Sequence, residues 1–256
     1  MEKSLISNPP YNLKWSVPPF ASLQPRFASF EVPPASNANY AFILSAWEEI
    51  EDKAAILLPN GVLSTTEKSE EAIRKKLVED NAIEAIINLP DKMFESTSIP
   101  TCIVVLNKQK KTRRIVFVDL RKSFVEEIRE QRGQYGGASH ERRTYKKTVN
   151  VLTDEIMQWA VDAINGLKDV PGFSKAATIE DIRKNDYILT ASRYIEAESE
   201  EQKHRAYADI VADYNRIIQY KNAVKLTVNE SLAKALGLYD MAVGQKILVP
   251  EEFELL

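Results

Sequence analysis

The stretch Ala54-Ala55-Ile56-Leu57-Leu58-Pro59-Asn60-Gly61 is a continuous apolar run closed by a turn signal. A short apolar run of this kind is typical of a strand that is buried on both faces of a sheet. Similar runs lie on either side of it, separated by helical patterns such as residues 69–80; they are Ser4–Ser7, Ile83–Leu89, Thr101–Leu106 and Ile115–Asp119. Apolar strands that alternate with helices predict an α/β domain with a largely parallel sheet.

Beyond residue 120 the chain is more charged, and its pattern predicts helices over 123–131, 153–166 and about 196–224. Residues 186–195 are expected to be extended. The last helix has apolar residues at a sustained spacing of three and four, which is typical of a helix that packs on another helix. These residues are Tyr207, Ile210, Val211, Tyr214, Ile217 and Ile218, with Lys221 continuing the row. The packing partner could be the chain's own body or another subunit.

The composition argues against several classes of protein. The chain has 256 residues, of which 44% are hydrophobic and 28% charged, as in an ordinary globular protein. Its apolar runs are shorter than the ~20 residues of a membrane span, and its start does not resemble a signal peptide, so we expect a cytoplasmic protein without membrane contact. One cysteine and two histidines argue against an intrachain disulfide and a metal site. The net charge of −3 argues against DNA binding through bulk charge alone.

The residues Asn8-Pro9-Pro10-Tyr11 directly follow the first expected strand, and a long loop over 12–36 follows them. The side-chain carbonyl of Asn8 and the backbone carbonyl of Pro9 can accept hydrogen bonds from both N–H groups of a planar amine, while the prolines fix their directions. Tyr11 offers a ring for stacking. Two such acceptors would localise the lone pair of adenine's amino nitrogen, although the base must first leave the duplex. Asn-Pro-Pro is also a good turn, so the tetrapeptide alone leaves a structural role open.

Further motifs, in the same order and spacing, resemble the modification subunit of type I restriction-modification systems over roughly residues 4–196. They are Ser36–Phe42, Leu58–Leu63, Ile73–Leu77, Ile86–Pro90, Phe94, Ser98–Ile103, Leu106–Lys108, Asn185–Leu189 and Ser192–Tyr194. That family methylates N6 of adenine in DNA with S-adenosylmethionine, and it works with a specificity subunit and a restriction subunit. The resemblance implies the second half of a Rossmann-like methyltransferase sheet, followed by a C-terminal helical region.

The same resemblance implies roles for individual residues. Asn8, Pro9 and Tyr11 would hold the target adenine as catalytic residues, with tyrosine at a position where the family often has phenylalanine. Ligands of open α/β sheets lie at the carboxyl ends of the strands. The substrate-binding residues expected there are Pro10, Asn60, Gly61, Ser98 and Pro100. For Asn60 and Gly61, turn formation alone is the alternative explanation.

Two basic segments are candidates for contact with DNA phosphates. The first lies between two expected strands and contains Lys110, Lys111, Arg113 and Arg114; the second contains Arg142 and Arg143. A solvated hairpin and a flexible loop are the alternatives.

The family's glycine-rich strand-to-helix turn, which cradles the methyl donor, has no counterpart in this sequence, so the cofactor-binding residues stay unknown. We expect the C-terminal half of a methyltransferase domain over 1–122, a family-specific helical and loop extension over 123–195, and a helical partner-binding region over 196–256. The bare edge of the first strand predicts pairing with a separate N-terminal half or self-association.

Three functions stay open. The chain could be the catalytic half of an adenine methyltransferase that needs its missing half and a specificity subunit for activity. It could instead be a non-catalytic remnant that serves as an interaction module. Asn-Pro-Pro-Tyr is also compatible with a methyltransferase that acts on protein glutamine, which uses the same acceptors, but the Ser36–Phe42 and Leu58–Gly61 segments favour the DNA-modifying family.

Overall fold

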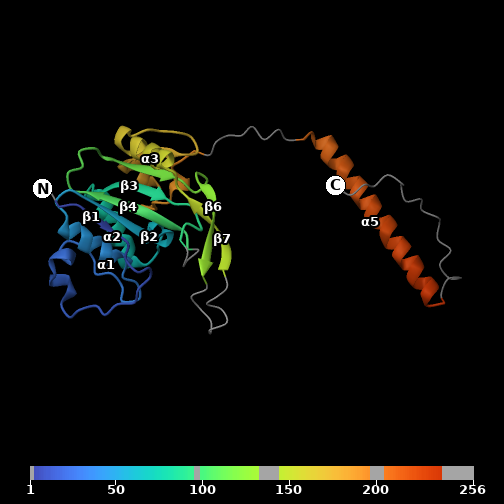
Figure 1. Ribbon diagram of the computed structural model, residues 1–256, viewed down its shortest axis with the longest axis horizontal. Coiled ribbons are helices and arrows are strands. Elements are labelled where there is room, and N and C mark those ends of the chain that lie inside the picture. The colour runs from blue at the N-terminus through green and yellow to red at the C-terminus, as the bar shows by residue number, and fades with distance from the viewer. Residues whose placement is uncertain (1–2, 95–98, 133–143, 197–204, 238–256) are drawn as a thin grey trace. The chain divides into compact units, whose positions relative to one another are not determined.

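The computed structural model describes residues 3–94, 99–132, 144–196 and 205–237. The chain divides into two compact units, residues 1–198 and residues 199–256. Among the described residues, all strands belong to the first unit, and the second unit contains one long helix (Figure 1). None of the described helices is both long and apolar enough to cross a membrane.

The first unit is built on a six-stranded sheet with the order β1-β2-β4-β3-β5-β8. Its strands are β1 (Leu5–Ser7), β2 (Lys53–Pro59), β3 (Ile83–Asn88), β4 (Thr101–Asn107), β5 (Arg114–Asp119) and β8 (Ser174–Thr178). β1, β2, β3 and β5 run in one direction, whereas β4 and β8 run antiparallel to their neighbours. The predicted α/β class is confirmed, but the sheet is mixed rather than largely parallel. The connection between β3 and β4 returns at the same edge of the sheet, which makes β4 antiparallel.

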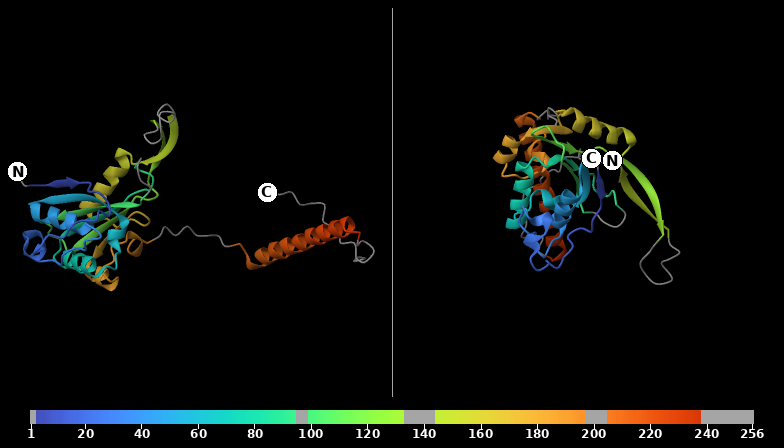
Figure 2. Two further views of the ribbon diagram at one scale, coloured as in Figure 1. Left: turned by 90° about the horizontal axis from the view of Figure 1, so that it is seen from below. Right: turned by 90° about the vertical axis from the view of Figure 1, so that its left-hand side faces the viewer.

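Helices cover the two faces of the sheet unequally (Figure 2). On one face, buried side chains of the helices α1 (Asn39–Glu49), α2 (Lys68–Glu79) and α4 (Ile179–Lys184) pack against β2, β3 and β4. On the other face, α3 (Asp154–Gly166) packs on β5 and β8. Over β1 this second face is open, since Ile6 has 91% of its surface exposed.

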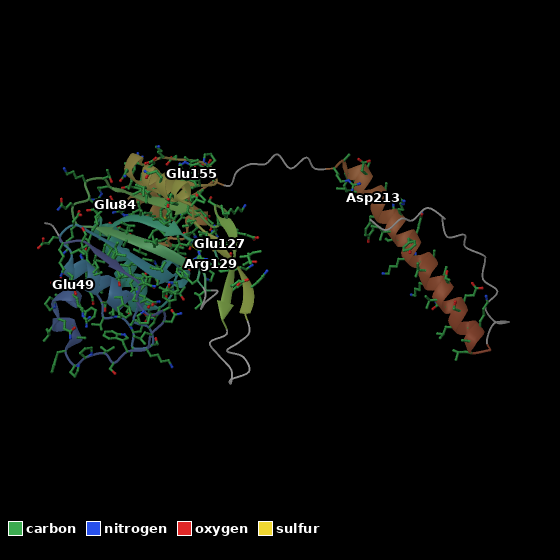
Figure 3. The ribbon with its side chains drawn as sticks, in the orientation of Figure 1. Glu49, Glu84, Glu127, Arg129, Glu155 and Asp213 are labelled. Atoms are coloured by element: carbon green, nitrogen blue, oxygen red, sulfur yellow. The ribbon has the colours of Figure 1, made fainter. Side chains whose placement is uncertain are left out.

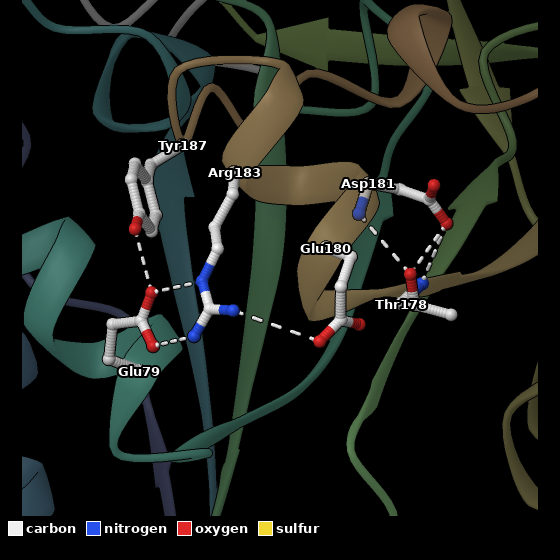
Figure 4. A network of polar contacts seen from close by, with 6 residues as sticks. All are labelled: Glu79, Thr178, Glu180, Asp181, Arg183 and Tyr187. Atoms are coloured by element: carbon white, nitrogen blue, oxygen red, sulfur yellow. Dashed lines mark hydrogen bonds and ion pairs between the residues drawn. The ribbon is translucent and has the colours of Figure 1, made fainter.

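Side chains fix the ends of these helices. The Glu67 carboxylate accepts the N–H of Glu70 at the start of α2 at 2.9 Å. Thr178 and Asp181 form a capping box at the start of α4 (Figure 4). Arg183 of α4 then donates to both carboxylate oxygens of Glu79 at the end of α2, at 2.8 and 2.6 Å. These contacts hold α4 against α2.

Two sequence-based expectations for the second half of the chain were wrong. The helix predicted over 123–131 is the strand β6 (Val125–Arg132), which pairs with β7 (Thr144–Val151). The three-residue spacing of Val125 and Ile128 imitates a helix, and strand pairing overrides it. Residues 186–195 form turns and a short 3-10 helix, η4 (Ala191–Arg193), rather than an extended segment.

The last helix is shifted along the chain relative to its prediction: α5 spans Tyr207–Ala235. The C-terminal helical region is therefore confirmed. Its apolar side chains are exposed, including Tyr207, Ile210, Tyr214, Ile217 and Ile218. The glycines at 133–137 and the tail beyond residue 237 lie outside the described residues. Figure 3 shows the side chains of the described residues in each unit.

Candidate functional site

Sequence-predicted site residues meet at one edge of the sheet. Because β1, β2, β3 and β5 are parallel, their carboxyl ends lie at the same edge, where β4 also begins. Asn8 follows β1, Asn60 follows β2 and Pro100 precedes β4. The N–H of Asn60 donates to the carbonyl of Pro100 at 3.0 Å, which joins two of these segments. Ser98 lies outside the described residues.

The Asn8-Pro9-Pro10-Tyr11 segment exposes its polar group and partly buries its ring. Asn8 is exposed, Pro9 is buried and Tyr11 is half-buried. Burial raises the pKa of Tyr11, with a smaller contribution from the Cys102 thiol. Cys102 is paired with Leu58 in the β2–β4 ladder. Tyr11 therefore lies near the ends of β2 and β4 as a neutral ring, while Asn8 stays accessible at the end of β1.

Two asparagines fix the turn that follows Tyr11. The N–H of Asn12 donates to Asn39 Oδ1 at 3.1 Å, and Asn39 Nδ2 donates back to Asn12 Oδ1 at 3.0 Å. Asn39 is 1% exposed and is the first residue of α1. Asn12 has a positive φ of 50°, a conformation that asparagine tolerates better than most residues. The motif is thus attached to the helix layer immediately after its aromatic residue.

Backbone hydrogen bonds join the two arms of the loop that follows the motif. The N–H of Ala38 donates to Leu13 O at 2.8 Å, and the N–H of Trp15 donates to Ala35 O at 3.0 Å. Between these ties the chain forms two 3-10 helices, η1 (Ala21–Leu23) and η2 (Pro25–Phe27). Phe27 is 1% exposed within the core. A long loop with both arms paired and a buried anchor can hold a defined surface beside Tyr11.

The turn after β2, η3 (Asn60–Leu63), is supported from behind by groups that our sequence analysis did not assign to the site. The Tyr40 hydroxyl donates to Val62 O at 2.7 Å, and the N–H of Leu189 donates to Leu63 O at 2.9 Å. Tyr40 and Leu189 both come from segments quoted above for the family resemblance. These segments therefore stabilise the η3 turn beside the candidate site.

Arg74 joins the segment after η3 to the segment after α4. It is 2% exposed, and its guanidinium donates to Thr65 O at 2.9 Å and to Tyr187 O at 2.8 Å. Tyr187 in turn donates its hydroxyl to Glu79 at 2.7 Å, within the network of Figure 4. The sequence signal that could have identified this role is an arginine on the apolar face of the helix, three and four residues before Leu77 and Val78.

Two buried amide oxygens near the site have no hydrogen-bond partner among the described residues, namely Asn60 Oδ1 and Asn88 Oδ1. Asn88 is the last residue of β3 and is 2% exposed. Our sequence analysis missed Asn88, although a polar residue inside an apolar strand is a recognisable signal. Buried acceptors without partners are rare in folded proteins.

The first basic segment lies away from this edge. Lys110, Lys111, Arg113 and Arg114 connect the end of β4 to the start of β5, which is at the opposite edge of the sheet. Lys110 Nζ donates to Ile83 O at 2.6 Å, and burial lowers the pKa of Lys110 to about 8. The structure thus does not bring this segment to the candidate site. Arg142 and Arg143 of the second segment lie outside the described residues.

The described residues do not form a cradle for S-adenosylmethionine. The described strand-to-helix turns at this edge contain a single glycine, Gly61, and a Cβ placed there would meet no atom within 4 Å. A turn that brings its backbone against a nucleotide needs several glycines to allow that approach. Among the described residues, no three metal-ligating side chains of the His, Cys, Asp and Glu types lie together.

Comparisons with known proteins give one consistent result. A family model described as N-6 DNA Methylase matches residues 2–203. A curated relative, the type I restriction enzyme HindI methylase subunit of Haemophilus influenzae, is 28% identical over 91% of this chain and 50% of its own length. The MpnII methylase subunit of Mycoplasma pneumoniae is 33% identical over 78% of this chain and 34% of its own length.

A solved structure supports the same fold. The methyltransferase subunit of a type I restriction-modification system from Streptococcus thermophilus matches with a TM-score of 0.64 and 33% identity, covering 76% of this chain and 38% of that one. The resemblance to type I modification subunits that the motifs indicated is therefore confirmed. The chain spans half or less of the length of these relatives.

Proposed function

The chain belongs to the N-6 DNA methylase family, and we propose that it carries the adenine-holding part of a type I DNA methyltransferase. The proposed reaction is methyl transfer from S-adenosylmethionine to N6 of adenine in DNA. The observation that carries the proposal is the position of Asn8-Pro9-Pro10-Tyr11 at the carboxyl edge of the sheet. Asn8 is exposed there, and Tyr11 is half-buried beside it.

In this proposal the chain's residues act on the amine and the ring of a flipped adenine. Asn8 Oδ1 and the Pro9 carbonyl accept one N–H bond each from the amino group, and the two acceptors draw its nitrogen toward tetrahedral geometry. Tyr11 stacks on the base. Stacking contributes ~1–3 kcal/mol, which offsets much of the few kcal/mol needed to extrude the base. The reaction needs no strong base, because the methyl group of the donor is highly electrophilic. The proton of the amine leaves to solvent after the methyl transfer.

S-adenosylmethionine supplies an electrophilic methyl group when it is bound, and we assign none of the described residues to it. We propose instead that the donor-binding half of the methyltransferase sheet pairs along the open edge of β1. Among the described strands β1 is outermost in the six-stranded sheet, so its second edge can pair with a strand from a partner. Ile6 is 91% exposed on the uncovered face of β1. The proposed enzyme is active only when both halves are assembled.

We also propose that α5 binds other subunits of a type I system, the specificity subunit above all. The row from Tyr207 to Ile218 is exposed along the helix. A helix with a sustained apolar seam is stabilised by packing on another helix. Phosphate contact by the turn at Lys110–Arg114 is not part of this proposal, because the turn lies at the opposite edge of the sheet.

The experiment that tests the proposed function follows a labelled methyl group from S-adenosylmethionine in the assembled enzyme. We expect label in N6-methyladenine of DNA, because the acceptors and the stacking ring fit a planar base. Label in protein glutamine and none in DNA would support the glutamine methyltransferase instead. Label in neither substrate, with wild-type folding and assembly, would favour the non-catalytic interaction module.

A further inference from the structure

A two-stranded antiparallel ribbon, formed by β6 and β7, extends from the first unit away from its sheet (Figures 1 and 2). The strands pair from Val125 with Val151 at the base to Arg132 with Thr144 at the outer end. Residues 125–130 are exposed along β6. Ile128, near the middle of the ribbon, has 68% of its surface exposed. A large part of the ribbon is therefore open to a partner.

The base of the ribbon is fixed to the edge of the sheet that carries Asn8. Asn150 Nδ2 donates to the backbone carbonyl of Asp91 at 2.9 Å and to its carboxylate at 3.1 Å. The N–H of Asn150 donates to Lys92 O at 3.2 Å. Asn150 is 4% exposed, so these bonds are protected from water. Asp91 and Lys92 lie three and four residues after Asn88, the last residue of β3, which places the ribbon's attachment at the edge of the candidate site.

The charge of the ribbon changes along its length. The inner pairs contain the acidic residues Glu126 and Glu127. The outer four pairs contain four basic residues and one acidic residue; they are Arg129 with Lys147, Glu130 with Lys146, Gln131 with Tyr145, and Arg132 with Thr144. Arg129 also forms an ion pair with Glu127 at 3.0 Å. In a chain of net charge −3, the ribbon therefore becomes more basic away from the body.

We propose that the β6–β7 ribbon lies against the DNA duplex that flanks the target adenine and contacts its phosphates. This inference rests on the proposed function. A two-stranded ribbon fits the major groove of DNA, and phosphate contacts position a protein on the duplex without reading its sequence. An acidic protein surface would also attract the basic end of the ribbon. The attachment of the ribbon at the edge that carries Asn8 favours DNA, because DNA is the substrate proposed for that edge.

For a duplex that lies across the strands of the sheet, the strand order sets the distance along the DNA. Four strand spacings separate β1 from β5 in the sheet. At ~4.8 Å per spacing, the ribbon base lies ~19 Å from Asn8. This corresponds to ~6 base pairs at ~3.4 Å each. The eight residues of β6 add a reach of up to ~26 Å. We therefore expect contacts between ~6 and ~13 base pairs from the methylated adenine, on one side only.

The test uses one engineered thiol. Cys102 is the single cysteine of the chain and is buried, and burial raises its pKa to about 12. Ile128→Cys therefore adds one reactive thiol on the ribbon, to which a photo-crosslinker is attached. The control is Glu180→Cys on α4, whose side chain is 65% exposed at the opposite edge of the sheet. Crosslinks to DNA are mapped on a duplex with one target adenine, in the assembled enzyme.

We expect Ile128→Cys to crosslink to DNA within the calculated window and Glu180→Cys to give no crosslink. A methylating enzyme whose ribbon crosslinks to protein only, or to DNA no more than the control does, would overturn the inference. The proposed function is scored separately by N6-methyladenine in the same samples. Ribbon crosslinks without methylation would overturn the proposed function and support the ribbon contact. Methylation without ribbon crosslinks would support the proposed function and overturn the ribbon contact.

Charge variants give a second, independent readout. Lys146→Gln with Lys147→Gln removes two positive charges from the outer ribbon. The loss of two phosphate contacts makes the negative slope of log affinity against log salt less steep by ~1.8. The matched control, Lys111→Gln with Arg113→Gln, removes two exposed charges at the opposite edge of the sheet. Equal changes in both double variants would contradict a ribbon-specific contact.

Discussion

The reciprocal hydrogen bonds between Asn12 and Asn39 are expected to determine how firmly Tyr11 is held. Asn39→Ala removes the 3.1 Å bond from the Asn12 N–H and the 3.0 Å bond to Asn12 Oδ1. Each such bond contributes ~1 kcal/mol net. We therefore expect the free energy of unfolding to fall by ~2 kcal/mol. In the assembled enzyme the affinity for a flipped adenine should fall too, because the turn after Tyr11 loses its support.

A double-mutant cycle isolates this interaction. The second substitution is Asn12→Gly, since glycine accepts the positive φ of 50° at this position without strain. Asn12→Gly keeps the backbone N–H and removes only the side-chain acceptor of the Asn39 Nδ2 bond. Urea unfolding of the two single variants and the double variant should therefore give a coupling energy of ~1 kcal/mol, the net contribution of one hydrogen bond. Asn185→Ala serves as the control partner, because Asn185 bonds locally to Asp181 O and should combine additively with Asn39→Ala. A coupling energy below ~0.5 kcal/mol for Asn12 and Asn39 would refute the reasoning.

Three further predictions concern stability and reactivity. Arg74→Met leaves the carbonyls of Thr65 and Tyr187 without their buried donor, so urea unfolding should show a loss of ~2–5 kcal/mol, and a loss below ~1 kcal/mol would contradict its role in joining these two segments. The Arg183 guanidinium, and then the Tyr187 hydroxyl, lower the pKa of Glu79 from 4.5 to about 2. Glu79 therefore contributes stability above pH 4.5 that is lost as the pH falls toward 2; thermal melts of Glu79→Gln should lose less stability over this range than wild type, and parallel curves would exclude the linkage. Cys102 should not react with a thiol reagent at pH 8 until urea unfolds the protein, because burial raises its pKa to about 12; rapid reaction of the native chain would show that the site opens.

The sequence was sufficient to predict the fold class because the strands of the main sheet are apolar and short. Ala54–Leu58 reads as a buried strand without knowledge of its neighbours, and its place at β2 agrees with that interpretation. The direction of β4 was not predictable in the same way. An apolar run carries no information on whether its connection crosses the sheet or returns at the same edge.

The β6–β7 ribbon shows where local patterns fail. Val125 and Ile128 have a spacing that fits a helix. The segment forms a strand instead, because all eight residues of β6 pair with β7. Pairing between distant segments cannot be deduced from periodicity within one of them. The ribbon's attachment through Asn150 to Asp91 was equally invisible in the sequence.

The sequence was sufficient to nominate Asn8 and Tyr11 as candidate site residues, and their roles stay a prediction; the residues that support them were not predictable. Asn8 and Tyr11 carry their chemistry in residue type and order. The roles of Arg74 and Asn39 depend on carbonyl and amide partners that come from other segments of the chain. The basic run at Lys110–Arg114 illustrates the opposite error. Its composition suits phosphate contact, but topology places it at the far edge, and Lys110 is used within the protein.

The central claim is that Asn8 at the end of β1 activates the adenine amino group. The most direct measurement is the rate of N6-methyladenine formation by the assembled enzyme with wild-type Asn8 and with Asn8→Ala. The control is Asn165→Ala, at an exposed asparagine of α3. Loss of one oriented hydrogen-bonding group at a reacting centre costs ~100-fold or more in rate. The account predicts a loss of this size for Asn8→Ala, with assembly unchanged and with a near wild-type rate for the control. A wild-type rate for Asn8→Ala would contradict it.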